Sequence, residues 1–159
     1  MEYLDLYNEK KEKIGKTILR GTEIPLGYYI MIVVVFIENN EGEFLFQYTS
    51  KEKGNVWATT GGHVKSGDDA LITIVKEVEE ELGIKLNKNE LKHIFTGMKN
   101  GRILEAFYIK KDIDINSLTL QKEEVESVKW LSKNELRKLI NQDNVRKSNI
   151  EILKELGLI

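Results

Sequence analysis

Three glutamates crowd one face of a segment whose pattern predicts a helix. Glu77, Glu80 and Glu81 stand at positions i, i+3 and i+4 of the segment EVEEE. Side chains at these spacings are neighbours on a helix, and like charges there cost about 0.2–0.5 kcal/mol per pair. The glutamates also lie in the last turns of the helix, where the helix dipole disfavours negative charge. A segment shaped only for stability would carry lysines at these positions.

A divalent cation would remove this repulsion. Mg²⁺ prefers oxygen ligands in an octahedron, and two or three carboxylates on one helical face leave positions for water and phosphate. We therefore expect Mg²⁺ at this face, with Mn²⁺ as the alternative ion. A solvated acidic face is the alternative interpretation of EVEEE taken alone.

The segment around the glutamates has the pattern of one amphipathic helix. Apolar residues recur at spacings of three and four within Leu71–Leu82, which is typical of a helix with one buried side. Ser66, Asp68 or Asp69 can cap its start, and Gly83 can end it. The acids would then lie along the edge of the buried side.

Segments with strand character stand on both sides of this helix. The longest apolar run, Tyr28–Ile37, is rich in β-branched residues, as in a central strand covered on both faces. Further strand patterns occupy residues 43–50, 56–60, 91–98, 103–111 and 125–132. Ser132 and Glu135 form a capping box that opens a helix to about Gln142, and a last helix is expected over Val145–Leu156. This order predicts an α+β (mixed α/β) fold with a mixed central sheet, hairpins and helices packed on it.

Length, charge and composition narrow the class of protein. The 159 residues predict a single domain, 1–159, in which 1–25 form an N-terminal hairpin extension and 143–159 a C-terminal helix. The net charge of -2 argues against a stable complex with nucleic acid. The absence of cysteine excludes disulfides, thiolate metal sites and a cysteine nucleophile. Because the longest apolar run is about half the length of a spanning helix, we expect a cytoplasmic protein with no membrane association.

The wider spacing around the glutamates resembles the box of the Nudix (MutT-like) hydrolase superfamily, G-x5-E-x7-R-E-U-x-E-E-x-G-U, where U is aliphatic. Besides the three glutamates, the matching positions are Gly62, Val78, Gly83 and Ile84. Asp68 replaces the first glutamate of the box, and Lys76 replaces its arginine. We expect Asp68 and Lys76 to keep an ion pair, but a looser one, because lysine lacks the planar two-point fork of arginine.

This resemblance implies an α/β/α sandwich and a diphosphate-cleaving activity. The substrate would be a nucleoside diphosphate derivative or a related metabolite, attacked by water at phosphorus. Glu77, Glu80 and Glu81 would act in catalysis as metal ligands, with a backbone carbonyl at Gly62 completing the shell. A further catalytic acid often comes from a later loop in this family, and Glu124 is the candidate here, with Glu123 beside it.

Four side chains outside the acidic face are candidates for substrate binding: Lys53, Trp57, His63 and Arg102. The cations, like Arg20, could meet phosphate, and the tryptophan could stack on a base. Three of them have a simpler interpretation: a surface cation for Lys53 and Arg102, and a buried structural ring for Trp57.

Two other functions compete with hydrolysis. A Nudix fold could bind a nucleotide without turnover, but such proteins usually lose the glutamates that persist here. The N-terminal segment also resembles the subgroup often labelled isopentenyl-diphosphate isomerase-like. True isomerases of that group use a cysteine, and this chain has none. By analogy with the superfamily, a homodimer is the expected oligomeric partner, beside the small diphosphate substrate.

Overall fold

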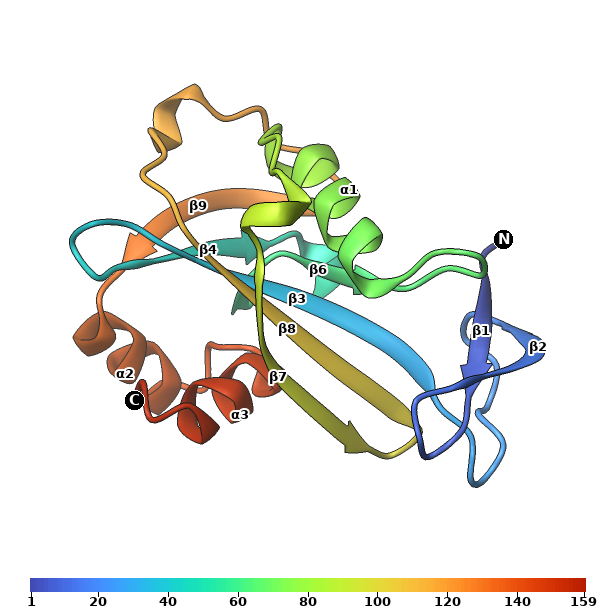
Figure 1. The fold of residues 1–159 in the computed structure, drawn as a ribbon. Helices are drawn as coiled ribbons and strands as arrows, with labels where there is room; N and C mark the ends of the chain where they lie inside the picture. The colour runs from blue at the N-terminus through green and yellow to red at the C-terminus, as the bar shows by residue number, and fades with distance from the viewer.

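The computed structural model describes residues 1–159 as a mixed sheet between helices, with a separate hairpin at one end (Figure 1). The hairpin consists of β1 (Tyr3–Tyr7) and β2 (Lys13–Leu19). The sheet contains β3 (Ile30–Glu38), β4 (Phe44–Thr49), β5 (Trp57–Ala58), β6 (Gly61–His63), β7 (Lys92–Lys99), β8 (Arg102–Lys110) and β9 (Val125–Leu131). The helices are α1 (Ala70–Leu82), α2 (Lys133–Asn141) and α3 (Lys147–Glu155). None of these helices has the length and apolar character needed to cross a membrane.

The central strand is β3, the apolar run of the sequence. It pairs in parallel with β8 from Ile30 to Glu38, and β6 pairs antiparallel on its other side with Gly62 opposite Val33. The turn after β3 leads into β4, but the two strands pair only at Glu38 and Phe44. Because β3 and β4 then diverge, β6 can insert beside β3, which brings the glycines of the box against the sheet. Of the segment predicted as one short strand, residues 56–60, only Trp57 and Ala58 form a strand, β5, and β6 is a separate strand that follows it.

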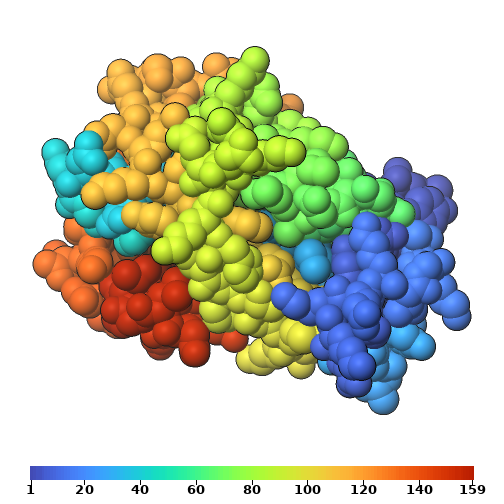
Figure 2. Space-filling view, in the orientation of Figure 1, coloured from blue at the N-terminus to red at the C-terminus, as the bar shows by residue number.

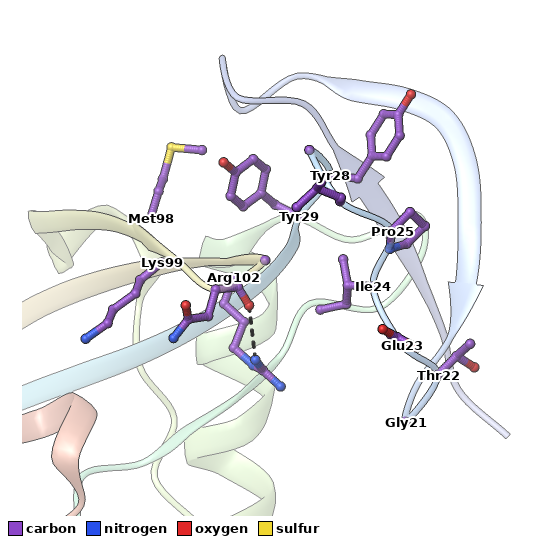
Figure 3. Close-up of a pocket in the computed structure, with 14 residues that line it drawn as sticks. Gly21, Thr22, Glu23, Ile24, Pro25, Tyr28, Tyr29, Met98, Lys99 and Arg102 are labelled. Carbon is purple, nitrogen blue, oxygen red and sulfur yellow. Dashed lines mark hydrogen bonds between the residues drawn. The ribbon is translucent and has the colours of Figure 1, made fainter.

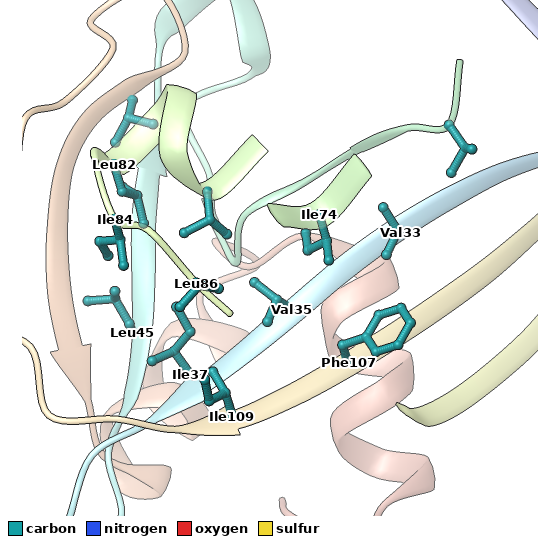
Figure 4. Close-up of a cluster of buried hydrophobic side chains, with 13 residues drawn as sticks. Val33, Val35, Ile37, Leu45, Ile74, Leu82, Ile84, Leu86, Phe107 and Ile109 are labelled. Atoms are coloured by element: carbon teal, nitrogen blue, oxygen red, sulfur yellow. The ribbon is translucent and has the colours of Figure 1, made fainter. Parts of the chain in front are cut away.

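Helix α1 covers one face of the sheet through its predicted apolar stripe (Figure 4). Ile74, Val78 and Leu82 are fully buried against Val33 and Val35 of β3. Burial of each such side chain is worth about 1.5–3 kcal/mol, so the stripe fixes which edge of α1 faces outward. The three glutamates of the box, Glu77, Glu80 and Glu81, lie along that edge.

Helices α2 and α3 cover the opposite face. Phe36, Phe44 and Phe46 pack there with Ile152 and Leu153 of α3. The sheet is thus enclosed between helical layers (Figure 1), and the predicted α/β/α sandwich is confirmed.

The predicted caps define the ends of the helices. The Asp69 carboxylate accepts a hydrogen bond from the Ile72 amide at 2.8 Å, so Asp69 is the N-cap of α1 among the three candidates. Gly83 ends the helix with a φ of 71°, a left-handed conformation that glycine adopts without strain. Ser132 and Glu135 form the predicted capping box of α2.

Candidate active site

A cavity of about 420 Å³ opens along the outward edge of α1. Acidic side chains on its wall are Glu2, Glu77, Glu80, Glu81 and Glu124. Basic side chains on its wall are Arg20, Lys53, Lys65 and Arg146, with His63 among them. One hollow therefore presents both the carboxylates that a metal ion requires and the cations that a phosphate chain requires.

Glu81 is the most unusual of these acids because it is buried, with only 5% of its surface exposed. The Gln47 side-chain amide donates a hydrogen bond to Glu81 Oε1 at 2.7 Å, and the Thr60 hydroxyl donates to Gln47 Oε1 at 2.8 Å, which fixes the orientation of the amide. Burial, together with the neighbouring Glu77 and Glu124, raises the pKa of Glu81 to about 8. A negative charge at this position is costly without a cation.

Glu77 is half-buried, and its carboxyl group interacts electrostatically with that of Glu81. Burial is also the main cause that raises the pKa of Glu77, and the charge of Glu80 adds to it. A Cβ atom on Gly62 would lie 2.8 Å from the Glu77 carboxyl carbon. The glycine of the box is therefore needed here to make room for a carboxylate.

Glu80 and Glu124 complete the acidic wall. Glu80 is exposed on the next turn of α1, and Glu124 lies in the loop before β9. Glu124 forms an ion pair with Lys53 at 3.4 Å. Of the two acids weighed in this loop, Glu124 lines the cavity, whereas Glu123 contributes its carbonyl oxygen to a hydrogen bond from Ser50.

The four cations of the wall come from four separate segments of the chain. Arg20 follows β2 and lies 2.8 Å from the Glu2 carboxylate, which also lies 3.4 Å from the Lys65 ammonium group. Arg146 precedes α3, and burial is the main cause that lowers its pKa. Its guanidinium donates one hydrogen bond of 3.5 Å, to a backbone carbonyl. A half-buried arginine with so little compensation suits an incoming anion.

His63 lies on the cavity wall in its neutral form. Burial, together with the charge of Arg20, lowers the pKa of His63 to about 4, against the opposing charge of Glu2. A neutral imidazole can donate one hydrogen bond and accept another, so His63 can contact a polar substrate group without adding charge.

The two departures from the box lie in contact with each other. The Lys76 ammonium group is 3.3 Å from the Asp68 carboxylate, and the lysine side chain remains 58% exposed. This pair links the loop before α1 to the residue that precedes Glu77. An exposed single-point pair of this kind contributes about 0–1 kcal/mol.

Two predicted substrate-binding residues do not line this cavity. Trp57 packs against the core cluster that includes α3 and contacts Tyr48, with the two rings tilted by 50° and their centroids 5.2 Å apart. Arg102 lies at the rim of a second, larger hollow of about 740 Å³ between the β7–β8 turn and the segment before β3 (Figure 3). That hollow contains one acidic side chain, Glu23, and no group of carboxylates. We therefore place the chemistry in the smaller cavity, and the roles of Trp57 and Arg102 stay predictions.

The acidic wall fits a divalent cation by the chemistry of its donors. Glu77, Glu80 and Glu81 supply hard carboxylate oxygens, the kind that Mg²⁺ and Mn²⁺ bind. The carboxylates do not already converge as a set of three ligands around one point, because Glu81 is turned toward Gln47 and Glu77. The raised pKa values show why a cation would be favourable there: it would relieve the mutual repulsion of the pair.

Several cavity residues escaped the sequence analysis. Gln47 follows three apolar residues, Phe44–Phe46, in β4, and that interruption was its only signal. Arg146, Lys65 and Glu2 carry no local pattern that separates them from surface charges. Their role depends on which segments the fold brings together.

Comparisons with known proteins point in one direction. The NUDIX domain model matches residues 29–156. An uncharacterised Nudix hydrolase of Listeria monocytogenes is 34% identical over 143 residues, covering 87% of this chain and 85% of the relative. Nudix hydrolase 3 of Arabidopsis thaliana is 29% identical, covering 90% of this chain and 21% of that protein. A crystal structure from Deinococcus radiodurans has a TM-score of 0.79 at 21% identity, over 97% of this chain and 98% of that one.

Proposed function

The chain belongs to the NUDIX family of hydrolases, and on that premise we propose that it is a metal-dependent pyrophosphohydrolase. It would cleave a diphosphate linkage in a nucleoside diphosphate derivative or a related metabolite. The observation that carries this proposal is the buried Glu81, held in one cavity with Glu77, Glu80 and Glu124 and faced by four cationic side chains. A module that only binds its ligand has no need for a buried carboxylate beside other acids.

The acidic wall would hold the metal ion. Glu77, Glu80 and Glu81 are the proposed ligands, with the carbonyl of Gly62 beside them, and Mg²⁺ or Mn²⁺ is the proposed ion. When bound, the ion neutralises charge on the phosphoryl oxygens and acidifies a nearby water. Gln47 holds Glu81 on the cavity wall through its 2.7 Å hydrogen bond.

The basic wall would hold the phosphate chain. Arg20 and Lys65 stand together on one side, and Lys53 and Arg146 come from elements on the other. Charge-assisted hydrogen bonds from these groups would orient the diphosphate for in-line attack. The water oxygen then forms a bond to phosphorus while the bond to the bridging oxygen breaks. A carboxylate on the wall, Glu77 or Glu124, accepts the proton of the water.

A phosphate-release assay on a panel of diphosphate compounds with Mg²⁺ tests this proposal. We expect turnover by the native chain and a loss of about 10²–10³-fold in kcat for Glu81→Gln, the range for single groups that stabilise transition-state charge. Glu79→Gln is the matched control, since Glu79 is exposed on the same helix outside the cavity, and it should keep native activity. Tight binding without release would instead favour a binding module.

A further inference from the structure

The N-terminal hairpin holds the loop that leads into the catalytic helix. The two oxygens of the Asp5 carboxylate each accept a hydrogen bond of 3.0 Å, one from the Ser66 hydroxyl and one from the Gly67 amide. Lys13 lies 3.1 Å from Asp5 and donates to the Asp68 carbonyl oxygen at 3.2 Å. Three successive loop residues are thus tied to the hairpin by side chains.

The backbone and a further ion pair strengthen this contact. The Ser66 amide donates to the Tyr3 carbonyl oxygen at 2.8 Å, and Leu4 forms an isolated β-bridge with Lys65. Glu2 lies 3.4 Å from the Lys65 ammonium group. In the space-filling view the N-terminal residues, in blue, lie directly against the green loop and helix (Figure 2).

The hairpin can act as a rigid support because it is itself anchored to the sheet. Tyr7 and Tyr29 exchange backbone hydrogen bonds of 2.8 and 2.9 Å just before β3. Leu4 and Leu6 are buried with Ile30, the first residue of β3. The support therefore connects the central strand to the loop.

The loop has little to hold it otherwise. Lys65, Ser66 and Gly67 are exposed, and Gly67 has a φ of 89°, which suits glycine alone. Within the loop the Asp68 amide donates to the Lys65 carbonyl oxygen at 3.0 Å. A side-chain pair joins Asp68 to Lys76 of α1, with a shorter acid than the box usually has and a single-point cation in place of its arginine. This tie leads directly to the residue before Glu77.

We propose that Asp5 is a positioning residue for the catalytic site, acting through Ser66 and Gly67. The hairpin compensates for the weakened pair Asp68–Lys76, and it fixes the loop, the start of α1 and thereby the carboxylate of Glu77. This inference rests on the proposed hydrolytic function, but its structural half can be measured without turnover.

The first experiment compares Asp5→Ala and Asp5→Asn with Glu9→Gln in the full chain. Glu9 is the matched control, an exposed acid in the same hairpin that does not reach the loop. We expect Asp5→Ala to lower kcat about 10-fold with KM within about twofold, the lower end for a group that orients a metal ligand. Asp5→Asn keeps one acceptor and should fall between Asp5→Ala and the native chain.

Amide hydrogen exchange gives the readout that is independent of activity. Exchange at Gly67 should rise at least about 10-fold in Asp5→Ala and stay native in Glu9→Gln, because local opening then costs less free energy. Ser66→Ala removes a single hydroxyl contact and serves if Asp5→Ala fails to fold. If the native chain hydrolyses nothing, the exchange result still decides whether the hairpin orders the loop.

A rescue variant separates positioning from a general loss of stability. Asp68→Glu with Lys76→Arg restores the longer acid and the two-point fork, so it should recover at least about threefold of the kcat lost in Asp5→Ala. Native kcat and native Gly67 exchange in Asp5→Ala would overturn the proposal. So would an equal loss in Glu9→Gln, or a loss that the rescue variant leaves unchanged.

Discussion

At the edge of α1, carboxylates are packed against other carboxylates, whereas at the hairpin they are packed against lysine, arginine and amide groups. The two regions differ in the direction of their pKa shifts. Burial and like charge raise the pKa of Glu77 and Glu81. At Asp5 burial alone would raise the pKa, but the Gly67 amide, Lys13 and Ser66 outweigh it, so the pKa is lowered. A charged carboxylate therefore destabilises the folded chain at the edge of α1 and stabilises it at the hairpin.

This difference indicates that the acidic edge of α1 serves function, whereas the hairpin contact serves structure. The repulsion at Glu77 and Glu81 is not fully relieved by the cations of the chain itself, and the proposed metal ion would relieve it. The attraction at Asp5 and Glu2 is complete within the chain and needs no ligand. Variants that change one region and not the other can test this distinction.

The largest of these effects is a loss of kcat, and we expect it on substitution of Gly62. A methyl group there would push against the side-chain end of Glu77, which can move without disturbing the backbone. We expect Gly62→Ala to lower kcat about 10²-fold, since a displacement of about 1 Å at a reacting centre can cost that much, while the midpoint of urea unfolding stays near native.

A double variant shows whether the glycine acts through Glu77. If it does, Gly62→Ala combined with Glu77→Ala should be no slower than Glu77→Ala alone, so the two losses are not additive. Additive losses would mean that Gly62 serves the site in another way, and the acidic edge would lose its proposed geometry.

The second effect is at Glu81 and concerns the free energy of unfolding in the absence of metal ions. The pKa of Glu81 in the folded chain is about 8, against an ordinary value of 4.5. The folded state therefore binds the proton more tightly, and stability falls as pH rises from about 4.5 through about 8. In the presence of a chelator, Glu81→Gln should gain about 1–3 kcal/mol over the native chain near pH 8 and almost nothing near pH 4.

Urea unfolding with EDTA across this pH range measures that gain. Glu79→Gln should stay within about 0.5 kcal/mol of native at every pH, as expected for an exposed position. If Glu81→Gln instead destabilises the chain near pH 8, Glu81 is a structural group, and the contrast between the two regions fails.

The third effect is also on stability, but its dependence on pH has the opposite sign to that at Glu81. Because the pKa of Asp5 lies below its ordinary value of 3.8, its contribution to stability is complete above that pH and is lost as pH falls through the folded-state value. Asp5→Asn should cost about 1 kcal/mol near neutral pH, and the difference from native should shrink in acid. Fluorescence-detected urea unfolding across the acid range checks this, and a constant difference would contradict it.

The sequence predicts the acidic edge far better than the hairpin contact. The stripe of Ile74, Val78 and Leu82 is periodic, so it indicated both the helix and the face on which the acids lie. It did not indicate that Glu81 would be buried, since that depends on Gln47 in a distant strand. The pairing of Asp5 with Ser66 joins exposed polar residues far apart in the chain, and no local pattern marks such a contact. The role of Trp57 stays a prediction for a related reason: an aromatic residue beside the box can serve the core or the substrate equally well.

The smallest effect is expected at Glu2, where the paired region reaches the cavity. Its side chain is 34% exposed, and its partners Arg20 and Lys65 are 43% and 53% exposed. Exposed pairs contribute about 0–1 kcal/mol, so Glu2→Gln should change stability by no more than about 0.5 kcal/mol, and less at high salt. Urea unfolding at low and high salt measures this, with Glu9→Gln as control. A loss well above 1 kcal/mol that salt leaves unchanged would mean that the hairpin depends on this pair for folding, and that the paired region is less self-sufficient than its contacts indicate.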